Sequence, residues 1–126
     1  MTEIISASEY RRRTPEHKLQ VLALDVLYFQ KAHPDIFAFA IPNAARRSPR
    51  LAASMKAEGL MAGVADLCVM LPCNRVAWLE LKKFKGRQSV EQKAFEARCK
   101  RLGHPYAVCS SLEQICDFLK QIGALK

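Results

Sequence analysis

The sequence lacks three features, and each absence excludes a class of protein. No apolar run approaches the roughly 20 residues that a membrane-spanning helix needs, so we expect no membrane partner. Residues 1–13 contain no apolar run behind a basic segment, so we expect no secretory signal and a cytoplasmic protein. Repeats, low-complexity tracts and linkers are also missing, which predicts one domain.

Cysteine pairs with metal-binding spacing are absent as well. The five cysteines are an odd number and include no C-x-x-C pair, which argues against a zinc site and against a disulfide scaffold. We therefore expect free thiols in a reducing compartment. Four of the five stand in apolar patterns and are predicted to lie in the core: Cys68, Cys99, Cys109 and Cys116.

Acidic residues are scarce relative to basic ones. The chain of 126 residues has 12 Asp and Glu against 20 Lys and Arg, which gives a net charge of +8. An excess of this size on a short chain indicates a polyanionic partner. The alternative is a solvated basic surface that only keeps the protein in solution.

Helix caps and turn signals divide the chain into eight elements. Thr14 and Pro15 are typical of a helix start, and His33-Pro34 is typical of its end. The signals predict helices at about 15–32, 51–58, 90–102 and 111–122, and strands at about 36–41, 66–71, 75–84 and 106–109. The order αβαββαβα predicts one α/β domain over residues 14–126, after a basic lead-in at 1–13.

The second and third predicted strands flank the turn signal Pro72-Cys73-Asn74 and should pair antiparallel. Asp66 and Glu80 are each seven residues from Cys73, so they should lie opposite each other on one face. Lys82 shares that face because side chains alternate along a strand. This depends on an odd loop length, since a two-residue loop would place Glu80 on the other face unless a bulge restored the register.

Glu80 interrupts an apolar run that is typical of a buried strand. Burying an ionised carboxylate without a partner costs on the order of several kcal/mol, so something must compensate. A magnesium ion, which takes carboxylate, water and phosphate oxygens, is one candidate. The alternative is a structural salt bridge between Glu80 and Lys82 on an exposed face.

The spacing of these residues resembles a known nuclease signature. Asp66, followed after 13 residues by Glu80-Leu81-Lys82, resembles the D…E-x-K motif of the PD-(D/E)XK nucleases. The surrounding residues resemble the virus-type replication-repair nuclease (VRR-NUC) family from about Glu16 to Leu119. They are Ile41-Pro42-Asn43, Arg46-Arg47, Gly59, Gly63-Val64-Ala65-Asp66-Leu67, Leu79-Glu80-Leu81-Lys82, Gly86-Arg87-Gln88-Ser89-x-x-Gln92, Leu102-Gly103, Tyr106-Ala107-Val108 and Ser110. One departure is Ala65, where this family often has proline; that residue is not a metal ligand.

The resemblance implies a restriction-endonuclease-like domain with a central mixed sheet flanked by helices. It also implies roles for individual residues. Asp66, Glu80, the backbone carbonyl of Leu81 and Glu16 would bind Mg²⁺, with Mn²⁺ able to substitute. Lys82 would orient or activate the attacking water, and Gln92 would complete the site. Gln92 and Glu16 also have structural explanations, in a capping box and in a first helical turn.

The resemblance further implies a magnesium-dependent, structure-specific DNA endonuclease of phage or bacterial origin, acting on branched DNA as a Holliday junction resolvase-like homodimer. Alternatives are a flap, nicking or restriction-type nuclease, or a non-catalytic DNA-binding module on the same fold. A basic scaffold protein that binds only other proteins is a further alternative. The intact set of Asp66, Glu80 and Lys82 speaks against the non-catalytic module.

Basic loops on either side of this motif are candidates for phosphate contacts. The predicted nucleic-acid-binding residues are Asn43, Arg46, Arg47, Arg50, Lys83, Lys85 and Arg87. Arg11 to Arg13 form either a further DNA-binding arm or a solvated surface.

Overall fold

The computed structural model describes residues 14–42 and 48–126. The elements follow in the predicted order αβαββαβα, which confirms the α/β fold with a mixed sheet. Their bounds are α2 Pro15–Gln30, β1 Phe37–Ala40, α3 Pro49–Ala57, β2 Leu67–Leu71, β3 Arg75–Leu81, α4 Val90–Arg101, β4 Tyr106–Cys109 and α5 Leu112–Gln121. The predicted lead-in and five residues of the first basic loop, 43–47, lie outside the described residues.

Three of the four strands are shorter than predicted, and β4 has its predicted bounds. The third strand, predicted to reach Phe84, ends at Leu81, although the Lys82 N–H still donates to the Cys109 carbonyl at 3.0 Å. Phe84, beyond that point, is exposed. The second strand begins at Leu67, immediately after Asp66. Asp66 therefore lies at the mouth of the hairpin rather than within the ladder.

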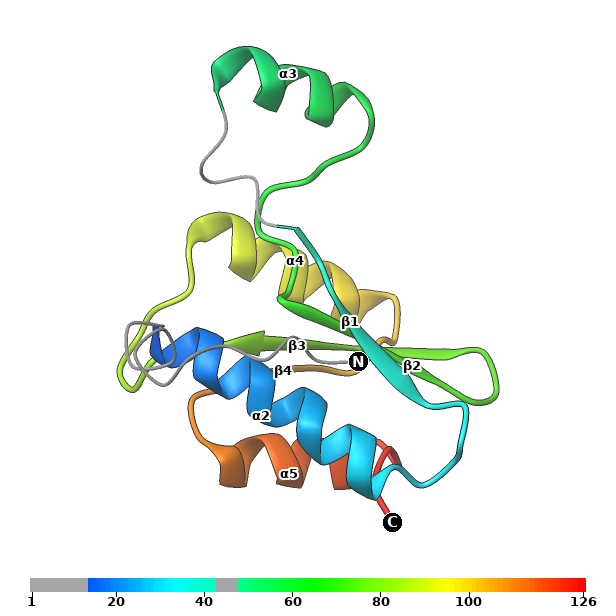
Figure 1. The fold of residues 1–126 in the computed structure, drawn as a ribbon. Helices are drawn as coiled ribbons and strands as arrows, with labels where there is room; N and C mark the ends of the chain where they lie inside the picture. The colour runs from blue at the N-terminus through cyan, green and yellow to red at the C-terminus, as the bar shows by residue number, and fades with distance from the viewer. Residues whose placement is uncertain (1–13, 43–47) are drawn as a thin grey trace.

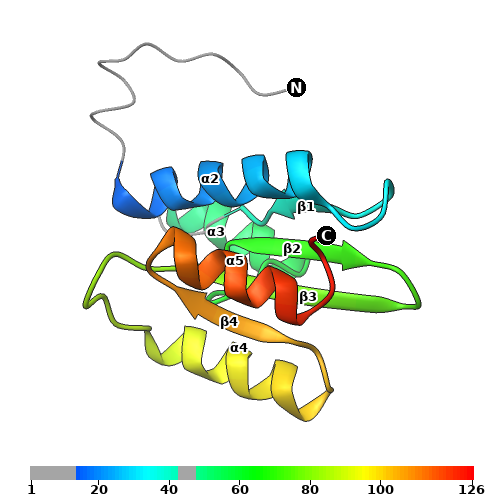
Figure 2. The same cartoon turned by 90° about the horizontal axis from the view of Figure 1, so that it is seen from below.

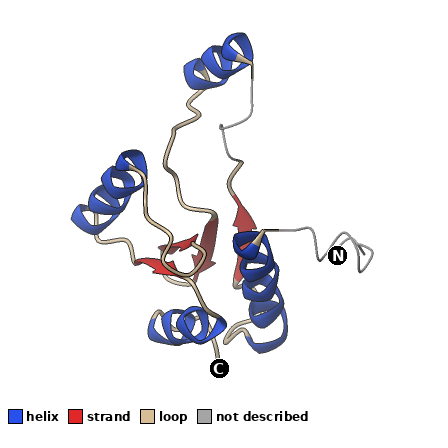
Figure 3. Ribbon diagram, turned by 90° about the vertical axis from the view of Figure 1, so that its left-hand side faces the viewer, coloured by secondary structure: helices blue, strands red, loops and turns tan. Residues whose placement is uncertain are grey.

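The sheet has the strand order β1-β2-β3-β4, and its last pair is parallel. The hairpin register is confirmed, since Leu67 lies opposite Leu79 and Leu71 opposite Arg75. Cys73 and Asn74 adopt positive φ angles of 64° and 62° in the three-residue turn, which is the odd loop length that the prediction required. Helices cover both faces, with α2 and α5 on one side and α4 on the other (Figures 1 and 3).

The face that carries α2 and α5 holds the hydrophobic core. Leu67, Leu79 and Leu81 are almost fully buried there, and α5 contributes Ile115 and Leu119. The two helices lie side by side over the sheet (Figure 2). The apolar face of α5 therefore belongs to the core. Of the four cysteines predicted to be core, Cys68, Cys99 and Cys109 are buried and Cys116 is half-buried.

The opposite face of the sheet carries the functional candidates and is covered mainly by α4. Trp78 on β3 packs edge-to-face against Phe95 of α4, with ring centroids 5.2 Å apart. Phe95 also contacts Tyr106 on β4, at 6.1 Å. Glu80 belongs to this face because it alternates with Leu79 and Leu81 along β3. The helix α4 thus covers the strand that carries the central carboxylate.

The helix α3 stands apart from the rest of the protein (Figure 1). It begins where the Ser48 side chain accepts the Leu51 N–H at 3.2 Å and Pro49 takes the first helical position. None of its residues is buried. Among the described helices, none combines the length and apolar character required to cross a membrane.

Candidate active site

The β2–β3 hairpin brings two carboxyl groups together at its open end. Asp66 and Glu80 are joined by a side-chain hydrogen bond. The Asp66 carboxylate also accepts a hydrogen bond at Oδ2 from the Leu81 backbone N–H, at 2.7 Å. The Asp66 carbonyl in turn accepts the Ile41 N–H at 2.9 Å, which ties this residue to the end of β1. Asp66 is therefore fixed from both neighbouring strands.

Glu80 is the one buried charged residue among those described, with 1% of its surface exposed. Burial, the hydrogen bond with Asp66 and the negative charge of Asp66 raise the pKa of the Glu80 carboxyl to about 8. Lys82 and the Tyr106 hydroxyl act in the opposite direction on this pKa. The Glu80 carboxyl therefore keeps its proton up to about pH 8.

The exposed-salt-bridge alternative does not fit this arrangement. Glu80 is buried rather than exposed. Within the described part of the chain, the ion pairs join His33 to Asp35 and Lys100 to Glu96, and neither involves Lys82. Lys82 is close enough to act on Glu80 electrostatically. The lysine is thus near the carboxyl pair but not paired within 4.0 Å, which leaves its ammonium available for another anion.

Tyr106 supports Glu80 from the neighbouring parallel strand. Its hydroxyl lies 3.5 Å from Oε2 of Glu80, a long hydrogen bond, and accepts one from Nε2 of Gln88 at 3.2 Å. Burial and the charge of Glu80 raise the pKa of the Tyr106 phenol, so it stays protonated and acts as a donor. Gln88 lies in the loop after β3, so this chain of hydrogen bonds links Glu80 to the basic loop.

An open groove of about 610 Å³ runs past these residues, and Asp66, Lys82, Arg87 and Gln92 lie along it. Gln92 also forms the predicted capping box. Its side-chain oxygen accepts the Ser89 N–H at 2.8 Å, while its own N–H donates to the Ser89 hydroxyl at 3.1 Å. The capping role of Gln92 is therefore confirmed; Gln92 also lines the groove, and its role in the active site stays a prediction.

Glu16 lies at the same end of the sheet, at the start of α2. Its Oε1 accepts the Lys83 backbone N–H at 3.3 Å. The described residues contain no group of three or more His, Cys, Asp or Glu side chains placed to hold a metal ion. The metal-binding roles of Glu16 and the Leu81 carbonyl stay predictions.

The donor set of the hairpin fits a hard divalent cation. Asp66 and Glu80 offer carboxylate oxygens, and the ionised form of Glu80 is unfavourable in its buried position without a positive partner. Magnesium is commonly bound by one or two carboxylates, with water and substrate phosphate completing its shell. Two acids are therefore sufficient protein ligands for such an ion.

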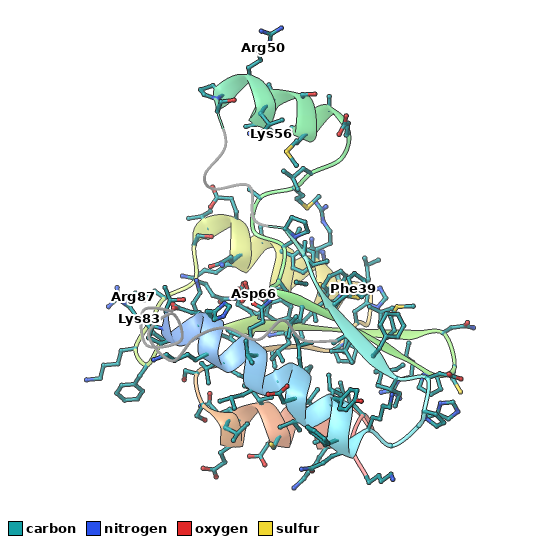
Figure 4. All side chains as sticks on the ribbon, viewed as in Figure 1. Phe39, Arg50, Lys56, Asp66, Lys83 and Arg87 are labelled. Carbon is teal, nitrogen blue, oxygen red and sulfur yellow. The ribbon has the colours of Figure 1, made fainter. Side chains whose placement is uncertain are left out.

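The basic residues predicted to contact DNA fall in three segments. Lys83, Lys85 and Arg87 follow β3 in one loop, and Lys83 and Arg87 lie close to each other beside the start of α2 (Figure 4). Arg50 lies on α3 and points away from the sheet (Figure 4). Asn43, Arg46 and Arg47 lie outside the described residues, as do Arg11 to Arg13.

Four residues at this site were not singled out as functional from the sequence. Tyr106 and Gln88 reach Glu80 through the parallel β3–β4 pair, whose register no local pattern reveals. Lys56 lines the groove from α3. Gly63 has φ +86° and lies against the backbone of Glu91 and Gln92. Its signal was available, since glycine three residues before Asp66 indicates a close backbone approach.

Solved structures described as VRR-NUC domains are similar to this chain. A structure described as "VRR_NUC domain" has a TM-score of 0.61 and 17% sequence identity, and the match covers 86% of this chain and 97% of the other. A "VRR_NUC domain protein" has a TM-score of 0.62 and 18% identity, with 84% and 85% covered. No family model matches the sequence, and no curated protein matches it. Over most of its length, the chain has the fold of the VRR-NUC domain.

Proposed function

We propose that this protein is a metal-dependent endonuclease that hydrolyses phosphodiester bonds in DNA. The observation that carries the proposal is the buried carboxyl of Glu80, which is hydrogen-bonded to Asp66 and near Lys82, two residues that line an open groove. Nothing in the hydrophobic core requires an acid at that position. The VRR-NUC fold, which the resemblance connects with nucleases, and the net charge of +8 both support this function.

Each residue of the site has a distinct role in the proposed hydrolysis. Asp66 and Glu80 hold the divalent cation, Mg²⁺ or Mn²⁺, and the Leu81 N–H keeps the Asp66 carboxylate in place. When bound, such a cation polarises the phosphodiester and lowers the pKa of water. Lys82 orients the attacking water and balances the negative charge that grows on the phosphate. Gln92, at the start of α4, completes the site from the groove wall.

Recognition would rest on DNA shape and phosphates rather than on base sequence. Its candidate contacts are mainly lysine and arginine side chains, which bind phosphates rather than base edges. We propose branched DNA as the substrate and a homodimer as the active form, because twofold symmetry supplies two active sites for two strands.

A cleavage panel tests the proposal. Linear duplex, flap, fork and four-way junction DNA would be incubated with the protein, with Mg²⁺ or with EDTA. We expect cleavage only with the cation, and the strongest cleavage on the junction. Asp66→Ala and Glu80→Ala should each lower the cleavage rate by at least about 100-fold. Both variants should still bind DNA, as measured by fluorescence anisotropy.

Lys82→Ala provides the second arm of this test. It should lose cleavage with little change in the denaturation midpoint, because no ion pair within 4.0 Å among the described residues holds this side chain. A variant that unfolds instead would support a structural role for Lys82. If the wild type binds DNA tightly but cuts no substrate in the panel with Mg²⁺ or Mn²⁺, the non-catalytic DNA-binding module is the correct description.

A further inference from the structure

The groove beside Asp66 has two walls of different origin. The inner wall is the start of α4 with its preceding loop, where Arg87 and Gln92 lie. The outer wall is α3, which contributes Ala52 and Lys56. Lys56 lies on the side of α3 that faces the body of the protein, whereas Arg50 points outward from the same helix (Figure 4). The helix that stands apart in the fold is therefore one side of the groove.

Few contacts among the described residues fix α3 in that place. The helix has nine residues and none is buried. Isolated helices shorter than about 12 residues are marginal in water, so packing must normally support them. A ligand that fills the groove would contact both walls at once and supply the missing contacts.

The chemistry of the groove favours a nucleic acid backbone as that ligand. Lys56, Lys82 and Arg87 bring three positive charges to it, against the acids Asp66 and Glu91. The charge of Asp66 would be offset by the cation of the proposed function. Apolar side chains also line the groove and suit the sugars between phosphates: Ile41, Pro42 and Met61.

We propose that α3 is a DNA-holding arm, which contacts the strand in the groove and binds one of its phosphates through Lys56. Lys82 and Arg87 contact the same strand from the floor and the inner wall. The proposal deepens the proposed function, on which it rests, by adding a binding element that the D…E-x-K residues do not include. The strand being cut is then held on both sides of Asp66.

Binding measured against salt concentration tests this role of Lys56. Fluorescence anisotropy with a labelled 20-base-pair duplex and a four-way junction, in Ca²⁺ to prevent cleavage, gives the dissociation constant. Loss of one phosphate contact lowers the slope of log affinity against log salt by about 0.9. We expect Lys56→Ala to show that change and a loss of affinity of about fivefold at moderate salt. Lys56→Arg, which keeps the charge, should retain both values.

Two variants separate the groove contact from a general loss of charge. Lys120→Ala removes one exposed charge from α5, on the far face of the sheet, and should change neither affinity nor slope. Arg50→Ala removes a charge from α3 itself, but from its outward side, and should have a smaller effect than Lys56→Ala. Equal losses from Lys56→Ala and Lys120→Ala would overturn the proposal, because only net charge would then matter.

A second copy of this chain is the alternative binding partner for α3. Leu51 on α3 is 47% exposed, and Leu51→Asp would disrupt an apolar contact between copies. The proposal expects this variant to keep the sedimentation coefficient of the wild type. A Leu51→Asp protein that falls from dimer to monomer, with Lys56→Ala binding DNA normally, would instead make α3 an interface between copies.

The failure of this proposal is distinct from that of the nuclease proposal. If Lys56→Ala binds DNA normally and the wild type cleaves DNA with the cation, the proposed role of α3 is wrong and the nuclease proposal stands. If the wild type cleaves no substrate but its DNA binding depends on Lys56, the role of α3 stands and the nuclease proposal is wrong.

Discussion

Asp66 and Glu80 share a hydrogen bond although the chain separates them by the whole β2–β3 hairpin. One of the two must hold a proton for this bond to exist. The acid that holds it is Glu80, because burial and the adjacent Asp66 raise its pKa from the ordinary 4.5 to about 8. The cation-free protein therefore keeps a neutral carboxyl at its centre near neutral pH, and measurable consequences follow from that proton.

The metal-free protein should lose stability as the pH rises from about 4.5 to about 8. In that window folded Glu80 keeps its proton and unfolded Glu80 has lost it, so raising the pH favours the unfolded chain. The slope contributed by this group is at most about 1.4 kcal/mol per pH unit. Glu80→Gln should flatten it, because the amide can donate to Asp66 without titrating. Urea denaturation in EDTA, at several pH values for both proteins, measures the difference.

Other titrating groups add their own pH dependence, but they are shared by the two proteins and cancel in the comparison. Parallel curves for wild type and Glu80→Gln would show that Glu80 is ionised in the folded protein and that the shared proton does not exist.

Binding of a divalent cation should release a proton below about pH 8. The ion competes with the proton on Glu80, so its apparent affinity should rise with pH, by up to about tenfold per unit, and level off above the pKa of about 8. Isothermal titration calorimetry with Mn²⁺, in buffers of different ionisation enthalpy, counts the protons released. Removing the ion with EDTA should reverse the binding. An affinity that does not change between pH 6 and 8 would place the ion away from Glu80.

Tyr106→Phe should impair the site without unfolding the protein. The ring contact with Phe95 remains, but the hydroxyl that donates to Glu80 and accepts from Gln88 is lost. Because that hydrogen bond lowers the pKa of Glu80, its removal should raise this pKa further. The acidic limb of the pH–rate profile should move to higher pH, and more cation should be needed for half-maximal activity.

Tyr28→Phe is the matched control, since Tyr28 is 74% exposed. If the role of Tyr106 were purely structural, Tyr106→Phe would lower the stability of the protein at every pH. The acidic limb of the pH–rate profile would then stay in its wild-type position. That outcome would remove Tyr106 from the positioning of Glu80.

The hairpin was predictable from the sequence because its information is local. Three turn residues, the alternation along two strands and the equal distances from Cys73 suffice to bring Asp66 opposite Glu80. The burial of Glu80 was predictable from the apolar residues on both sides of it in β3. The bounds of β3 were not, because its length is set by where its partners end.

The contacts between distant segments could not be read in this way. Tyr106 lies beside β3 only because the crossover through α4 sets a parallel register, Trp78 opposite Tyr106 and Glu80 opposite Val108. Lys56 faces the groove because of how α3 is placed, and a nine-residue helix with no buried face carries no pattern that indicates its orientation. The sequence therefore predicted that Asp66 and Glu80 lie together, but not which residues from distant segments surround them.

Gly63→Ala should displace Asp66 and cost more stability than the same change elsewhere. A methyl group at Gly63 would lie 2.4 Å from the Glu91 carbonyl carbon and 2.7 Å from the Gln92 nitrogen, and both are backbone atoms that cannot turn aside. Residues 63–66 would have to move off α4, which separates Asp66 from Gln92. We expect a loss of about 2–4 kcal/mol in the free energy of unfolding and a larger fractional loss of cleavage.

Gly103→Ala isolates the steric part of this loss. Gly103 has nearly the same backbone conformation, φ +82° against +86°, but a methyl group there would meet nothing within 4 Å. Its substitution should cost only the conformational penalty of about 1 kcal/mol and leave cleavage unchanged. The difference between the two variants in chemical denaturation then measures the packing of the Gly63 backbone against α4. If both lose the same stability and both keep full activity, that packing does not position Asp66.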